Sequence, residues 1–171
     1  LPDHVWSRLA STVYEEVRAL DEAATNRLRT ALLIPPERFT EEMIAFQAWM
    51  DLAHSKGGNP VVVRAQVMTQ LYVTMVWLRD SLMRPVAEAL PDAAAYPAVA
   101  RFLSGGQRRL LRNAVAHGRW CYLPGFDGLE YWAKPTRGGA HQRFEVSAEV
   151  LDRWQMLSRG TAIAVLRALT A

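Results

Sequence analysis

The stretch LLRNAVAHGRW, from Leu110 to Trp120, has the pattern of an amphipathic helix that ends in a glycine. Its apolar residues recur three and four positions apart, which is the spacing of a helix that buries one side. Gly118 occupies the position at which helices often end in the left-handed conformation, because glycine adopts it without strain. The stretch therefore predicts a helix that packs one side against a core and presents Arg112, Asn113 and His117 on the other.

Charge is distributed unevenly along the chain. The 171 residues carry a formal net charge of only +3, which by itself says little about nucleic acid. Between Ala93 and Phe126, however, there is no Asp or Glu, and there are five arginines: Arg101, Arg108, Arg109, Arg112 and Arg119. The preference for arginine over lysine fits both phosphate contact and a GC-rich genome, but genome composition does not explain the clustering.

Features that the sequence lacks exclude several classes of protein. A single cysteine, Cys121, leaves no internal disulfide, so we expect a reducing, cytoplasmic location. No apolar run reaches about 18 residues, and the first residues have neither the basic region nor the apolar region of a signal peptide, so we expect no membrane contact. Zinc-ligand pairs and glycine-rich phosphate loops are also missing, so we expect neither a metal nor a cofactor.

Hydrophobic periodicity predicts a mainly helical chain. The expected helices cover about Asp3–Leu33, Thr40–His54, Pro60–Leu90, Ala98–His117 and Ser147–Leu169. Thr40 and Ser147 are the expected N-caps of their helices. Pro85 should kink or divide the third helix, and the fourth is expected to be interrupted at Gly105 and Gly106.

Further expectations concern packing. The second helix should bury Met43, Ile44 and Trp49 or its neighbours, and residues 91–97 should form a linker. Most of the six tryptophans fall at core-like positions. Four aromatic residues lie beside the basic helix and could stack on bases instead, namely Trp120, Tyr122, Tyr131 and Trp132.

The residue pattern of the sequence changes after the basic helix. The turn cluster PGFDG separates two aromatic and apolar runs, which predicts a β-hairpin near Arg119–Leu123 and Leu129–Lys134. A third short strand is expected near Arg143–Val146. The sequence thus predicts one domain over residues 1–171. It is an up-and-down bundle of four to five helices, with a small hairpin insertion at about 119–146 before the last helix.

The residues of the basic helix fall into ordered rows. At about 100° per residue, Arg109, Asn113 and His117 share one line, with Arg108 and Arg112 beside it. Because they are five positions apart, Arg112 and His117 are separated by about 140° around the helix. A shared site for this pair needs either a distorted last turn or a second copy of the helix from a two-fold dimer.

Two interpretations of this face remain open. Arginine binds phosphate in a fixed fork geometry, and histidine transfers protons near neutral pH, which together supply what metal-free cleavage of RNA needs. Alternatively, His117 only interacts with the terminal carbonyls of the helix, and the arginines form a solvated face.

The sequence LRNAVAHGRW closely resembles the signature of the HEPN superfamily, an arginine followed by four to six residues and a histidine. Arg112, Asn113 and His117 occupy its positions, since family members often have Asn directly after the Arg. HEPN domains are up-and-down helical bundles with this motif late in the chain, before a final helix. The following RWCYLPGFDGLEYW is similar to a plasmid- and bacterial-genome-encoded branch with a short hairpin there.

The resemblance implies a metal-independent endoribonuclease, often a toxin or antiphage effector, that acts as a homodimer with facing motifs. It implies acid–base catalysis by His117, phosphate binding by Arg112, and orientation of the imidazole or the RNA by Asn113. Products would carry a 2′,3′-cyclic phosphate, and a cognate antitoxin protein would be a further partner. The residues expected to bind RNA beside the motif are Arg108, Arg109 and Arg119. The family also contains inactive domains, so the alternative is a module that only binds RNA or a protein through this face.

Overall fold

A computed structural model describes residues 3–32, 34–55 and 60–171. The chain is mainly helical and has a small antiparallel sheet before the final helix, which confirms the predicted fold class. In chain order the elements are α1 (Asp3–Arg18), α2 (Glu22–Ala31), α3 (Pro36–Ser55), α4 (Pro60–Leu71), α5 (Arg84–Ala89), α6 (Ala95–Ser104), α7 (Gly106–Ala116), β1 (Trp120–Tyr122), β2 (Gly128–Ala133), β3 (Gln142–Ser147) and α8 (Ala148–Thr170).

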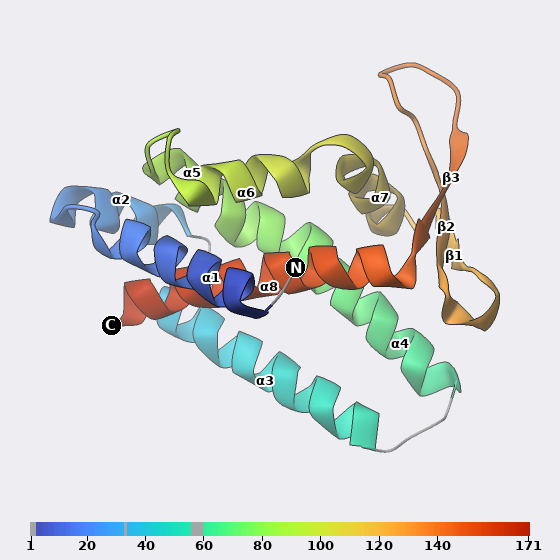
Figure 1. Ribbon diagram of the computed structural model, residues 1–171, viewed down its shortest axis with the longest axis horizontal. Helices are drawn as coiled ribbons and strands as arrows, with labels where there is room; N and C mark the ends of the chain where they lie inside the picture. The colour runs from blue at the N-terminus through green and yellow to red at the C-terminus, as the bar shows by residue number, and fades with distance from the viewer. Residues whose placement is uncertain (1–2, 33, 56–59) are drawn as a thin grey trace.

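The last helix organises the molecule. Figure 1 shows α8 running through the middle, with α6 along one side and α3 along the other. The sheet lies at one end, beside α7 and the start of α8. The hydrophobic core therefore forms around α8, and the basic helix is held between this core and the sheet.

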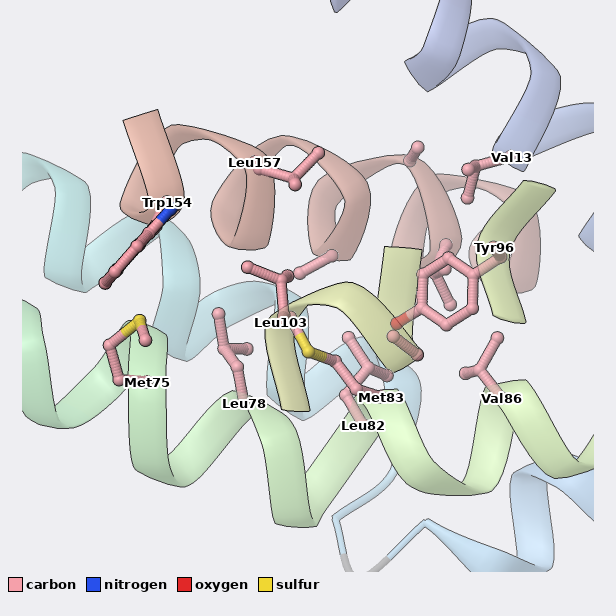
Figure 2. Packing of buried hydrophobic residues seen from close by; sticks show 14 of the residues in the cluster. Val13, Met75, Leu78, Leu82, Met83, Val86, Tyr96, Leu103, Trp154 and Leu157 are labelled. Atoms are coloured by element: carbon pink, nitrogen blue, oxygen red, sulfur yellow. The ribbon is translucent and has the colours of Figure 1, made fainter. Parts of the chain in front are cut away.

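Buried side chains from helices far apart in sequence meet in one cluster. In Figure 2, Leu103 of α6 lies between Leu157 of α8 and Leu78 of the segment that joins α4 to α5. Trp154 packs beside Met75 at one end of the view. This cluster is what fixes α7, because Leu110, Leu111, Ala114 and Val115 are all buried in it.

The first helix is shorter than predicted, and a single helix over Asp3–Leu33 is wrong. The chain leaves the helix after Arg18 and starts α2 at Glu22. The reason is Asp21, whose carboxylate accepts a hydrogen bond from the amide of Ala24 at 2.6 Å and so caps a new helix. The spacing of apolar residues continues across this cap, so periodicity alone did not reveal the break between α1 and α2.

The second helix starts earlier than predicted. Pro36 is the first residue of α3, a position where its missing N–H costs nothing. Thr40 is therefore not the N-cap; it lies inside the helix, where its hydroxyl donates to the carbonyl of Pro36 at 2.8 Å. Met43 is buried as predicted, but Ile44 is 65% exposed, and its predicted burial is wrong. Trp49 lies outside the described side chains.

The predicted break at Pro85 takes the form of a change in helical hydrogen bonding. Two π-helical segments, Tyr72–Trp77 and Arg79–Met83, join α4 to α5. Within them the amide of Arg84 bonds to the carbonyl of Arg79, five residues back. Because Pro85 has no N–H, the carbonyl of Ser81, four residues back, has no α-helical donor, and a π-turn in the second segment is one way to accommodate this. The first segment, Tyr72–Trp77, lies too far from Pro85 for this effect.

The linker before the basic helix is shorter than residues 91–97, because α6 already begins at Ala95. Pro97 lies in the first turn, where helices tolerate proline. A carboxylate from α1 caps this helix: Glu16 accepts hydrogen bonds from the amides of Ala95 and Tyr96, the latter at 3.0 Å. The predicted interruption at Gly105 and Gly106 is confirmed, because α6 ends at Ser104 and α7 starts at Gly106.

The sheet has the order β1-β2-β3, with both neighbouring pairs antiparallel. It confirms the predicted hairpin and third strand, with a shift of one residue at each strand end. Ser147 is the N-cap of α8, as predicted, and its hydroxyl accepts from the amide of Val150 at 3.4 Å.

Candidate functional site

The end of α7 has the geometry that Gly118 predicts. Gly118 has a φ of 65°, and its amide bonds to the carbonyl of Val115 at 3.2 Å. The amide of Arg119 bonds to the carbonyl of Ala114 at 2.8 Å. This pair of bonds is a Schellman motif, which satisfies the last carbonyls of the helix with backbone donors. The side chain of His117 is exposed at this end, and these carbonyls do not depend on its imidazole.

Arg112 and Asn113 form a local pair. The Nε and Nη2 atoms of Arg112 donate to Oδ1 of Asn113 at 3.3 and 2.9 Å, which fixes the orientation of the guanidinium. The third nitrogen, Nη1, is covered and has no hydrogen-bond partner. An amide oxygen leaves the charge of the guanidinium uncompensated, whereas a carboxylate would neutralise it.

Other cations crowd the guanidinium of Arg112. Burial lowers the pKa of Arg112, the positive charges of Arg79 and Arg109 lower it further, and Asp80 acts in the opposite direction. Arginine stays protonated in proteins under ordinary conditions. Because Arg79 is ion-paired with Asp80, Arg109 is the neighbouring cation that adds to the positive potential around Arg112. Arg79 comes from the π-helical segment and was missed by the sequence interpretation, because nothing in the sequence reports which helix faces α7.

Arg112 and His117 do not share one side of α7. The helix is regular up to Ala116 and ends in the Schellman turn, so there is no distorted last turn to bring them together. Residues five apart on such a helix are separated by about 140°. A shared site for Arg112 and His117 therefore requires a second copy of the helix, since the last turn of α7 is not distorted.

Arg108 is half-buried and packs against side chains of α6 and α8. Its guanidinium lies 3.7 Å from the centre of the Phe102 ring and 5.5 Å from that of Trp154. Its Nε also donates to the carbonyl of Phe102. These contacts fasten the start of α7 to α6 and α8 through a cation–π interaction. The predicted role of Arg108 in RNA binding would therefore require it to leave these partners.

Arg109 and Arg119 both reach the loop between β2 and β3. Nη2 of Arg109 donates to the carbonyl of Pro135 at 3.0 Å, and Nη1 of Arg119 lies 2.8 Å from Nε2 of His141. Burial, Arg119 and Lys134, in that order, lower the pKa of His141, which favours a neutral imidazole that accepts from Arg119. The sequence interpretation missed His141, because only the register of the sheet shows that this loop returns to α7.

The aromatic residues of the hairpin divide into two groups. Tyr131 is fully buried, and Trp120 and Tyr122 are half-buried against the core. Trp132 is 36% exposed. Of the four aromatics beside the basic helix, Trp132 is therefore the most exposed.

In residues 3–32, 34–55 and 60–171, no three His, Cys, Asp or Glu side chains are grouped as a metal site would require. None of the helices described there is both long and apolar enough to cross a bilayer.

Comparisons with known proteins give no match: no family model, no curated protein and no solved structure matches this chain. The chemistry available at the end of α7 and around it is therefore the guide to what the protein does.

Proposed function

We propose that this protein is a metal-independent endoribonuclease of the HEPN type, with a role as a toxin or antiphage effector. The observation that carries the proposal is the end of α7. There, Asn113 fixes the charged guanidinium of Arg112, and His117 is exposed on the same short helix. The surrounding stretch from Ala93 to Phe126 has no acid that would repel a phosphodiester.

The proposed reaction is a transesterification within the RNA strand. A neutral imidazole of His117 takes the proton of a ribose 2′-hydroxyl, and the 2′-oxygen forms a bond to phosphorus. The bond from phosphorus to the 5′-oxygen breaks, and a protonated imidazole delivers a proton to that oxygen. The products are a 2′,3′-cyclic phosphate and a free 5′-hydroxyl. Arg112 stabilises the additional negative charge on the phosphoryl oxygens during the transfer.

A homodimer supplies the geometry that one chain lacks. Because Arg112 and His117 point in different directions around α7, the guanidinium of one copy and the imidazole of the other would face a common strand across a two-fold axis. The imidazole that takes the 2′-hydroxyl proton is then protonated, so the same group can deliver a proton to the leaving oxygen.

The direct test uses purified protein with single-stranded RNA in EDTA. We expect cleavage by the wild type, and a loss of at least about 100-fold in Arg112→Ala and in His117→Ala with unchanged melting. Arg101→Ala is the matched control, because Arg101 is an exposed arginine of the neighbouring helix α6. Cleavage that survives both substitutions, or that EDTA abolishes, would remove the mechanism.

A mixing experiment tests the composite site. The two inactive variants, Arg112→Ala and His117→Ala, are co-expressed with different tags and the mixed dimer is purified. Each mixed dimer would keep one of the two Arg–His pairs, so the purified mixed dimer should recover about half of the wild-type activity. If mixed dimers form and remain inactive, the two residues do not act across the interface.

The alternative is a non-catalytic module that binds RNA or a cognate antitoxin through the same face. The divergence of Arg112 and His117 within one chain favours it, because binding needs no convergence of the two groups. This reading predicts salt-sensitive binding without turnover. A gel shift that depends on Arg109 and Arg112 but not on His117 would support the module over the enzyme.

A further inference from the structure

The register of the sheet places a basic and aromatic row on its outer face. Arg119, which precedes β1, bonds through its carbonyl to the amide of Trp132, and Trp132 lies directly opposite Arg143 of β3. Residues directly opposite in antiparallel strands project from the same face of a sheet. The last pair of the register is Ala133 with Gln142, and extending its alternation by one residue past the strand ends puts Lys134 and His141 on this same face.

This face is open, whereas the other face of the sheet is buried. Leu129, Tyr131 and Val146 alternate with the outer residues and are at most 5% exposed, because α7 and α8 pack against their side. On the outer side, Trp132 has no ring partner and no side-chain hydrogen bond among the described residues. An exposed tryptophan at the centre of a sheet, with cations on both sides, is a typical stacking platform for an unpaired base.

The charges on this face are not evenly balanced. Arg143 bonds to Glu130 and to Glu145, each at 2.8 Å, so two carboxylates outnumber its single positive charge and this part of the face is not a site for phosphate. Neither Arg119 nor Lys134 forms an ion pair in the part of the chain that the structure describes, and the nearest polar partner of Arg119 is an imidazole. The positive potential is therefore concentrated at the end of the sheet that borders the loop and α7.

We propose that the outer face of the sheet binds single-stranded RNA, with one base stacked on Trp132 and the adjoining phosphates held by Arg119 and Lys134. Arg119 follows His117 by two residues, so a strand on this platform leads to the end of α7. The inference deepens the proposed function and rests on it, because it names the surface that would hold the substrate of the same site. Double-stranded RNA does not fit this mode, since its bases are already stacked and paired.

His141 lies in the path of such a strand. Its Nε2 atom accepts from Arg119, and a phosphate oxygen would compete for that donor. When Arg119 turns to the phosphate, the imidazole loses its hydrogen-bond donor and gains a negative neighbour, which favours its protonated form. His141 then adds a further cation to the bound strand.

The test measures binding of a short 2′-O-methyl RNA, which cannot be cleaved because it lacks the 2′-hydroxyl. Fluorescence anisotropy at about 50 mM salt keeps phosphate contacts strong. We expect Trp132→Ala to weaken binding by at least about 5-fold, and Trp132→Phe to retain most of the affinity, since a stacked base is worth about that much. Arg119→Ala combined with Lys134→Ala should weaken binding further.

Matched controls separate the platform from general effects. Tyr72→Ala removes another exposed aromatic ring, and Arg101→Ala another exposed arginine, so neither should change binding. A duplex of the same length should bind less tightly than the single strand. Wild-type affinity in Trp132→Ala with unchanged melting, or equal binding of single strand and duplex, would overturn the inference.

The outcomes remain distinguishable from those of the proposed function. If wild-type protein binds the oligonucleotide through Trp132 but never cleaves natural RNA, the platform stands and the nuclease fails. If it cleaves RNA and Trp132→Ala binds normally, the nuclease stands and the platform fails. Binding to vesicles of anionic phospholipid but not to RNA would assign the cations to a membrane surface and overturn the inference.

Discussion

At the scale of single residues, the pKa of His141 depends on the charged groups around its loop. Arg119 and Lys134 are the charged groups that lower its pKa, with desolvation as the larger cause. Replacing Arg119 by Met removes a positive neighbour, so the pKa of His141 should rise toward its ordinary value. An NMR titration of the imidazole measures this directly, with Arg101→Met as the control. An unchanged or lower pKa would mean that the contact with Arg119 does not persist in solution.

Asn113 offers a second prediction, because it holds Arg112 without neutralising it. Asn113→Ala should leave the guanidinium unfixed and reduce RNA cleavage by roughly 10- to 100-fold, since small misplacements of a binding group are costly. Asn113→Asp keeps the acceptors but cancels the charge, so it should weaken phosphate binding more than the alanine does. The two effects are measured as kcat and KM on one RNA substrate. Equal kinetics for Asn113→Asp and wild type would contradict this role.

The sequence predicted the roles of single residues correctly where the interacting groups lie within one turn of each other. Gly118 and Ser147 act through bonds to backbone groups a few positions away, and their motifs were predicted. The contact of Arg119 with His141 spans 22 positions, and it exists only because the strands fix the loop. Composition and spacing carry no information about such a contact, so His141 was missed.

At the scale of elements, α6 depends on a cap that comes from another helix. Glu16 of α1 accepts from the amides of Ala95 and Tyr96, and Ala94 at the N-cap position has no side chain that could do so. Glu16→Ala should therefore lower the free energy of unfolding by about 1 to 2 kcal/mol, the usual cost of a lost cap. Glu15→Ala is the matched control, since Glu15 is the adjacent carboxylate of the same helix. Chemical denaturation measures both, and equal stabilities would contradict the capping role.

The elements that were predicted incorrectly were misplaced for different physical reasons. Periodicity reports which side of a segment is apolar, and it stays in phase across a short break such as the one before Asp21. A cap from a distant helix, like Glu16, has no local sequence signal at all. The hairpin was predicted more accurately because its turn and its alternating strands are encoded within the same short segment.

At the scale of the whole molecule, the fold brings together cations from two elements, α7 and the sheet, and their joint action is visible in the dependence of RNA binding on salt. Each phosphate neutralised on a single strand contributes about 0.7 to the slope of log K against log salt concentration. If one strand crosses both elements, replacing Arg119 and Lys134 together should reduce the slope by about 1.4, and replacing Arg112 as well should reduce it by about 0.7 more. Arg101→Ala should leave it unchanged. Titrations of 2′-O-methyl RNA at several salt concentrations give these slopes. A triple variant no different from the double would mean that the strand contacts the sheet without reaching α7, and the link between the platform and the proposed catalytic residues would be lost.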